Sequence, residues 1–164
     1  MMFNEEMQNG EVDINVEGTI SMVLNEISIQ GYSKQPPFDI GRVEDRMISF
    51  ARDNAIVLGS NRLYMSARQL QHAMRKSKKE KGLSVATEEL IHFPRNRFAM
   101  DLYYDGECFI YTNGISKFIV HPNYEIRIGH DKRKLVNFIT ATRIKDKMEF
   151  NAKRYLKVKT DQDV

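Results

Sequence analysis

The sequence predicts an α+β fold in which N-terminal helices pack on a four- to five-stranded antiparallel sheet. Apolar residues recur at helical spacing in the first half of the chain. After about residue 97 they give way to short runs rich in Phe, Tyr, Ile and Val. Asp105-Gly106 and Asn113-Gly114 divide these runs and are typical of β-hairpins. A run of helices followed by a run of strands favours this layout over an alternating α/β fold.

The first 33 residues are predicted to form an acidic appendage that contains one helix. They hold six acidic residues and no lysine or arginine. Four apolar side chains follow helical spacing, and Gly31 ends the pattern: Ile20, Val23, Leu24 and Ile27. The Pro36-Pro37 pair predicts a linker over residues 32–41. The expected division is therefore residues 1–33 and residues 34–164.

The middle of the chain is predicted to alternate short helices and short strands. Residues 42–54 have the apolar spacing of a helix, and residues 56–58 and 63–65 read as short buried strands. A helix is expected over residues 66–81, because Ser66 and Gln69 form a capping-box pattern and Gly82 is a typical stop. A second short helix is expected after the following turn, up to about residue 94.

The helix expected over residues 66–81 is strongly basic on one side. Ala67, Leu70 and Met74 fall on one face, and the roughly opposite face carries Gln69, His72, Arg75, Lys76 and Lys79. Between Ser66 and Gly82 six basic residues stand against Glu80, whereas the whole chain has a net charge of +3. Such a patch suits a phosphate-rich partner. The plainer interpretation is a solvated helix face.

The second half is predicted to be a meander of antiparallel strands. The expected strands are residues 97–104, 107–112, 117–120, 134–144 and 154–159. His121, Pro122 and Asn123 are expected to break the third strand and lie in a loop, and residues 145–151 are expected to form a turn or short helix.

Composition limits the classes of function. No apolar run approaches the roughly 20 residues of a membrane span, so no membrane is expected as a partner. Cys108 is the only cysteine, which excludes an internal disulfide and a cysteine-based zinc site and favours a reducing cytoplasm. The four histidines show no metal-binding spacing. Neither a metal nor another cofactor is expected.

Several short phrases resemble one family. They are an H-x-x-R-x-x-K phrase (His72, Arg75, Lys78), the phrase E-E-L-x-x-F-P, and a late meander containing V-N-F-I-T-A-T and K-R-Y-L-K-V. Over about residues 63–159 the chain resembles the barnase/EndoU/colicin/RelE-like (BECR) nucleases of phages and bacterial polymorphic toxins. The resemblance implies helices packed on an antiparallel sheet and a metal-independent endoribonuclease. It also implies the cytoplasm of a bacterial host cell, RNA as substrate, and an immunity or antitoxin protein as a candidate partner.

The resemblance also implies a set of site residues. His72, Arg75 and Lys78 match the helix phrase, Thr140 or Thr142 the late-strand hydroxyl, and Tyr155 the aromatic near the end. By phase on the helix Lys78 ranks below Arg75, and Lys79 is its rival. Arg68, Lys76, Lys78 and Lys79 are expected to bind substrate phosphates.

The chemistry of metal-free RNA cleavage suits these residue types. The reaction needs a base for the 2′-hydroxyl, an acid for the 5′-oxygen and cations on the phosphorane, and it leaves a 2′,3′-cyclic phosphate. A histidine can serve as acid or base, an arginine can hold the phosphate, and a threonine or tyrosine can donate to it. Two alternatives stay open: a non-catalytic protein that binds nucleic acid or inhibits a host defence protein, and a degenerate nuclease fold with a structural or inhibitory role.

Overall fold

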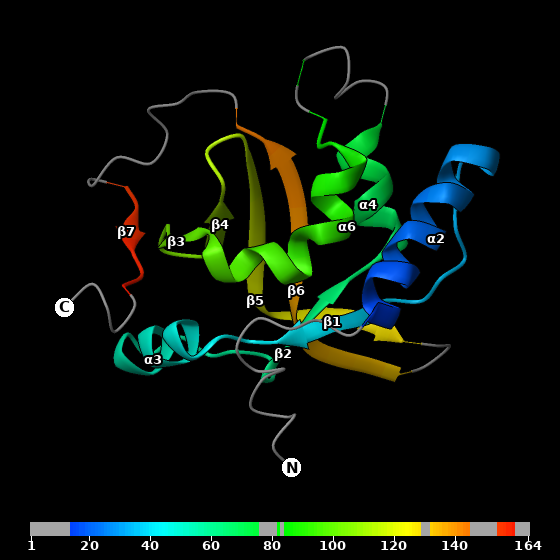
Figure 1. Cartoon of the computed structure of the whole chain (residues 1–164). Coiled ribbons are helices and arrows are strands. Elements are labelled where there is room, and N and C mark those ends of the chain that lie inside the picture. Colours follow the sequence, from blue (N-terminus) through cyan, green and yellow to red (C-terminus); the bar gives the residue numbers. More distant parts are fainter. Residues whose placement is uncertain (1–13, 76–81, 83, 129–131, 145–153, 160–164) are drawn as a thin grey trace.

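The computed structural model describes residues 14–75, 82, 84–128, 132–144 and 154–159. Helices α2, α4 and α6 gather on one side of a seven-stranded sheet, and α3 lies apart from them (Figure 1). The elements in chain order are α2 (Ile14–Gln30), β1 (Phe38–Arg42), α3 (Asp45–Asp53), β2 (Arg62–Met65), α4 (Ala67–Met74), α6 (Thr87–Asn96), the 3-10 helix η1 (Arg97–Ala99), β3 (Asp101–Tyr104), β4 (Phe109–Thr112), β5 (Ser116–Ile128), β6 (Lys132–Arg143) and β7 (Leu156–Lys157).

The sheet confirms the α+β class but is larger than the sequence predicts. Its strand order is β1-β2-β6-β5-β4-β3-β7, seven strands rather than four or five. Neighbours are antiparallel except β2 and β6, which pair in parallel through Leu63 with Asn137 and Tyr64 with Phe138. β1 occupies part of the predicted linker, whereas residues 56–58 form no strand. The sequence does not predict β1, because this strand has only five residues and contains Asp39 and Gly41, residue types that are rare in strands.

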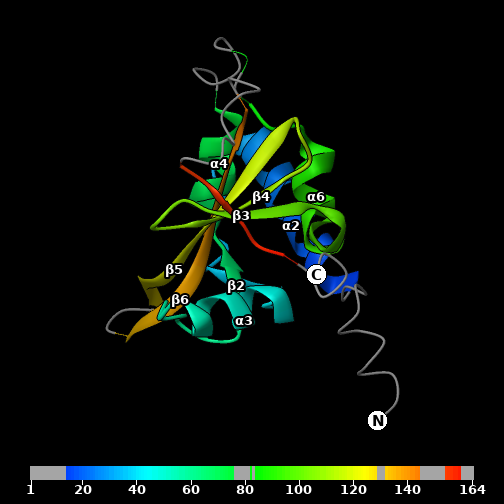
Figure 2. The ribbon, with the colours of Figure 1, turned by 90° about the vertical axis from the view of Figure 1, so that its left-hand side faces the viewer.

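Strand β5 does not break where the sequence predicts. It continues to Ile128, and a register shift between His121 and Tyr124 accommodates Pro122 and Asn123. Asn123 takes a positive φ of 54°, as bulges and turns allow for asparagine. The result is a long β5–β6 hairpin whose far end extends away from α2 and α6 (Figure 2). His121 is therefore a strand residue and not a loop residue.

The side chains of β6 point alternately to the two faces of the sheet, and only one of these faces is covered by α2, α4 and α6 (Figure 1). On β6, Ile139 and Ala141 belong to the main core, together with the buried side chains of α2, α4 and α6. Because strand side chains alternate, Phe138, Thr140 and Thr142 lie on the opposite face, which we call the second face. His121 lies opposite Phe138 across the β5–β6 ladder and shares the second face.

Helix α2 belongs to the main core, which crosses the boundary predicted near residue 33. Ile20 and Val23 are fully buried and Leu24 nearly so, in the same cluster as the sheet residues. Glu17 binds Arg95 of α6 at 2.9 Å. Gly31 ends the helix as predicted, with a φ of 87° that suits glycine and an N–H that donates to the carbonyl of Ile27 at 2.8 Å. These contacts give α2 a place in the main core, and deletion of residues 1–33 tests whether the rest of the chain folds without it.

Helix α4 begins as predicted and ends earlier. The Ser66 hydroxyl accepts from the backbone N–H of Gln69 at 3.3 Å, and Ala67, Leu70 and Ala73 are buried. The helix stops at Met74 instead of running to residue 81, because Arg75 is extended with a ψ of 154°. The N–H of Val85 then bonds the carbonyl of Ala73 at 3.2 Å. Residues 76–81 lie outside the described residues.

The parallel strand pair is held by one buried side chain. Asn137 is fully buried, accepts from the N–H of Gly59 at 2.9 Å and donates to the carbonyls of Ser60 and Arg62, both at 2.8 Å. A Cβ on Gly59 would lie 2.7 Å from the backbone of Val136, so only glycine fits there without a backbone shift. The loop before β2 is thereby fixed on β6.

Candidate nucleic-acid interface

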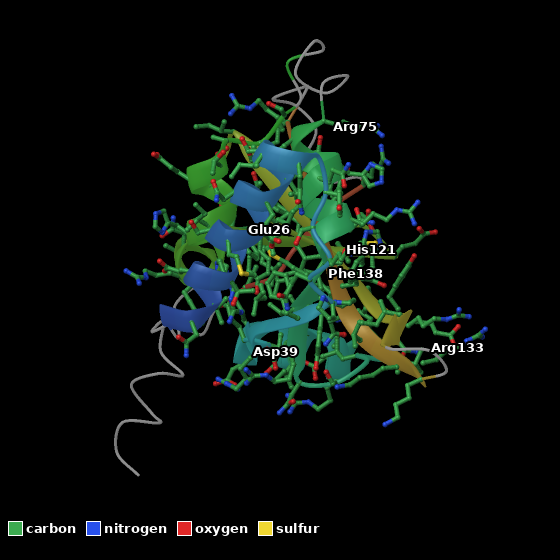
Figure 3. All side chains as sticks on the ribbon, turned by 90° about the vertical axis from the view of Figure 1, so that its right-hand side faces the viewer. Glu26, Asp39, Arg75, His121, Arg133 and Phe138 are labelled. Carbon is green, nitrogen blue, oxygen red and sulfur yellow. The ribbon has the colours of Figure 1, made fainter. Side chains whose placement is uncertain are left out.

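Three predicted site residues form a stripe along α4. Arg68 and His72 are one turn apart on the helix, and Arg75 follows directly after its end. Arg68 and Arg75 are exposed and His72 is half-buried. Figure 3 shows Arg75 at the end of α4 farthest from the β5–β6 hairpin. We call Arg68, His72 and Arg75 the α4 stripe.

The histidine and the second arginine of the stripe are in contact. Arg75 Nη1 lies 3.3 Å from His72 Nδ1. A guanidinium has donors and no acceptor, so this contact is a hydrogen bond only when Nδ1 of His72 carries no proton. A phosphate that draws the guanidinium away would release Nδ1. The pair therefore combines an anion ligand with a group that can exchange protons.

An open groove of about 410 Å³ lies at the N-terminal end of the stripe. We call it the α4 groove; the segments that line it are residues 33–35, Pro37, residues 66–69, residues 124–127 and Phe138. Among the described residues, its lining carries three cations, Lys34, Arg68 and Arg127, and one acid, Glu125. Glu125 is paired with Arg133 at 3.6 Å. The groove thus presents net positive charge beside the helix that the sequence marked as basic.

An aromatic pair forms one wall of the α4 groove. The rings of Tyr124 and Phe138 stack with centroids 5.3 Å apart and planes 13° apart. Phe138 is buried, whereas 49% of Tyr124 is exposed. His121 lies 5.9 Å from Tyr124 between ring centroids. Figure 3 shows His121 and Phe138 close together, as expected for residues that pair across the β5–β6 ladder.

His121 links the groove to one of the predicted threonines. Its Nε2 lies 3.2 Å from Thr140 Oγ1 and its Nδ1 lies 3.3 Å from Cys108 Sγ. Burial, with smaller contributions from Asp105 and Glu107, raises the pKa of Cys108 to about 11, so the thiol is protonated at neutral pH and is a poor nucleophile. The thiol can donate to Nδ1 or accept from it, and the tautomer of His121 sets the direction of both contacts.

The pKa of His121 predicts a pH dependence of stability. Burial lowers this pKa below its ordinary value of 6.5, and the nearby Asp105 only partly opposes the shift. The unfolded chain therefore binds the proton first as the pH falls through 6.5, so the free energy of unfolding should fall in acid. Urea unfolding at about pH 7 and about pH 5.5 should show a smaller acid-induced loss for His121→Gln than for wild type. Equal losses in both proteins would contradict this role for His121.

The other predicted site residues do not join one cluster with the α4 stripe. Thr140 contacts His121 and lines a small pocket with Ser66 and Gln69 at the start of α4, but that pocket includes neither His72 nor Arg75. Thr142 lies two residues further along the second face, opposite Lys117 of β5. Tyr155 is 5% exposed, with its ring 6.5 Å from that of Tyr103. Lys76, Lys78 and Lys79 lie outside the described residues.

Several side chains of the groove and its surroundings were not predicted as site residues. Among them are Lys34, His121, Tyr124, Arg127 and Phe138. A signal existed for His121: the alternation of Phe118 and Val120 with Ile119 places His121 on the face opposite the core. Pro122 led to the prediction of a loop at this position instead, because proline usually ends a strand.

Metal-ligand clusters and membrane-spanning helices are absent from the described part of the chain. Within it, no group of three or more His, Cys, Asp and Glu side chains is arranged to hold a metal ion. None of its helices combines the length and the apolar character that crossing a bilayer requires.

Comparison with known proteins found no matching family model, no matching curated protein and no matching solved structure.

Proposed function

We propose that this protein binds RNA and cleaves it without a metal ion. The observation that carries the proposal is the α4 stripe, which places a histidine in contact with an arginine and leads from there to a cationic groove. Several cations along one path match the repeated phosphates of a nucleic acid. The groove adds aromatic side chains, which favour unpaired bases. The resemblance to BECR nucleases, which the sequence alone suggests, supplies the expectation of cleavage.

In this proposal His72 and Arg75 act on the scissile phosphate. A base removes the proton of the 2′-hydroxyl, and the 2′-oxygen forms a bond to phosphorus. The bond from phosphorus to the 5′-oxygen then breaks, and an acid protonates that oxygen. His72 exchanges one of these protons, and Arg75 binds the non-bridging oxygens. Thr140 contributes only indirectly, through its contact with His121. Tyr155 is buried against Tyr103, so it has a packing role.

Cleavage in EDTA tests the proposal. The purified protein should cut a labelled single-stranded RNA with EDTA present and leave a 2′,3′-cyclic phosphate. A matched RNA with one 2′-deoxy nucleotide at the cut position should survive there, because it lacks the attacking hydroxyl. This chemistry would be ruled out if cleavage required a divalent ion, or if the RNA with the 2′-deoxy nucleotide were cut at that position as fast as the all-ribose RNA.

The second candidate is a protein that binds nucleic acid without cutting it. It is favoured by the separation of the expected catalytic side chains, because His72 contacts Arg75 whereas Thr140 contacts His121 of β5. Salt-dependent RNA binding with no cleavage under any condition would select this candidate. The immunity or antitoxin partner and the bacterial cytoplasm rest on the family resemblance alone.

A further inference from the structure

We propose that the α4 groove is a subsite for one unpaired RNA nucleotide, whose base stacks on Tyr124 and whose phosphate binds the cations of the groove. This inference rests on the proposed RNA binding and adds the class of RNA and the residue that recognises it. It concerns a part of the molecule that includes none of the residues expected to perform the chemistry.

The ring of Tyr124 has the properties of a stacking platform. One of its faces lies against Phe138, nearly parallel to it, and half of the residue is still exposed beside the groove. Phe138 is itself buried among Ile126, Val136 and Tyr64, so it forms a fixed support. A ring already held in place loses little freedom when a base packs on it. Stacking on such a ring is favourable for every base, because every base has a π-face.

The cations around Tyr124 suit the phosphate of the same nucleotide. Lys34 comes from the segment before β1, Arg68 from α4 and Arg127 from β5, so three separate segments bring positive charge to one groove. Glu125, the only acid among the described residues of the lining, is paired with Arg133. The volume of about 410 Å³ lies within the roughly 300–1,000 Å³ typical of small-molecule sites. Charge and space therefore both fit a nucleotide.

The same features select single-stranded over double-stranded RNA. Inside a duplex both faces of a base are already stacked on its neighbours, so neither can reach Tyr124 without unstacking. The double helix can still approach the cations through its phosphates. We therefore expect Tyr124 to matter for single strands and Arg68 to matter for both forms.

Binding of 2′-O-methyl RNA tests the subsite, because this RNA cannot be cut through its 2′-position. Fluorescence anisotropy with a labelled single strand should show affinity about 5- to 150-fold weaker for Tyr124→Ala than for wild type. Tyr124→Phe should bind like wild type. Leu135→Ala is the matched control, because Leu135 has the same 49% exposure, lies on the same hairpin and does not line the groove. Thermal unfolding of each variant checks that it is folded.

The outcomes separate the subsite from the proposed function. If Tyr124→Ala binds the single strand as wild type does while Arg68→Ala binds it more weakly, RNA binding stands and the stacking subsite is wrong. An equal loss of affinity for a duplex would also overturn the subsite, because stacking requires an unpaired base. If wild type binds neither form, both the subsite and the proposed function fail. Fluorescence of 2-aminopurine in the strand should be quenched by wild type and less by Tyr124→Ala.

Discussion

His72→Ala is expected to lower the rate of RNA cleavage in EDTA by about 10²- to 10⁴-fold, the usual contribution of a general acid or base. The imidazole is the one proton-exchanging group of the α4 stripe, and Arg75 Nη1 holds its Nδ1 at 3.3 Å. Arg75→Ala should lower the rate by a comparable factor, because the guanidinium is needed most when negative charge develops on the phosphorane. Single-turnover cleavage of an end-labelled RNA measures both effects.

Gln71→Ala is the matched control for these variants. Gln71 is exposed on the same helix and carries no charge, so its loss should leave the rate unchanged. Equal cleavage by wild type and a folded His72→Ala variant would place the chemistry elsewhere. His121→Gln would then be the next variant to measure, because His121 contacts Thr140 beside the groove.

Ile20→Ala is expected to lower the free energy of unfolding by about 2–5 kcal/mol, because Ile20 is fully buried and its truncation leaves a cavity in the core. Ile29→Ala on the same helix should change it by less than about 0.5 kcal/mol, because Ile29 is 76% exposed. Deletion of residues 1–33 removes the whole buried face of α2 and should abolish cooperative unfolding. Urea denaturation followed by circular dichroism measures all three effects. A cooperative transition in the deletion variant would support the domain division predicted from the sequence.

The local signals in the sequence predicted the elements that depend on local chemistry. Ser66 caps α4, Gly31 ends α2, and the turns at Gly106 and Gly114 have the positive φ that their sequences suggest. Elements fixed by distant partners were not predictable in this way. β1 forms because β2 pairs with it, and α4 ends where Val85 returns to bond Ala73. Neither partner is visible in the neighbouring sequence.

The same distinction between local and distant contacts applies to the residues of the candidate site. His72 and Arg75 share a face by helical phase, so this part of the stripe could be predicted from the sequence, although α4 ends at Met74, before Arg75. The α4 groove could not, because Lys34, Tyr124 and Arg127 are brought to it by three different segments of the tertiary structure. Thr140 was predicted without its partner His121, because the bulge that carries β5 past Pro122 has no clear sequence signature.

The Asn137 contacts have a consequence for the order in which the molecule can assemble. Its hydrogen bonds reach back 75 to 78 positions, to the loop that precedes β2 and to Arg62, the first residue of β2. During synthesis the segments containing β1 and β2 leave the ribosome long before β6, and until then they have no sheet on which to dock. Closing so long a stretch of chain is slow, because its entropy is lost before its contacts are gained. We therefore expect the hairpins of the second half to form first and the N-terminal strands to join last, so folding intermediates expose the edge of β6 that β2 later covers.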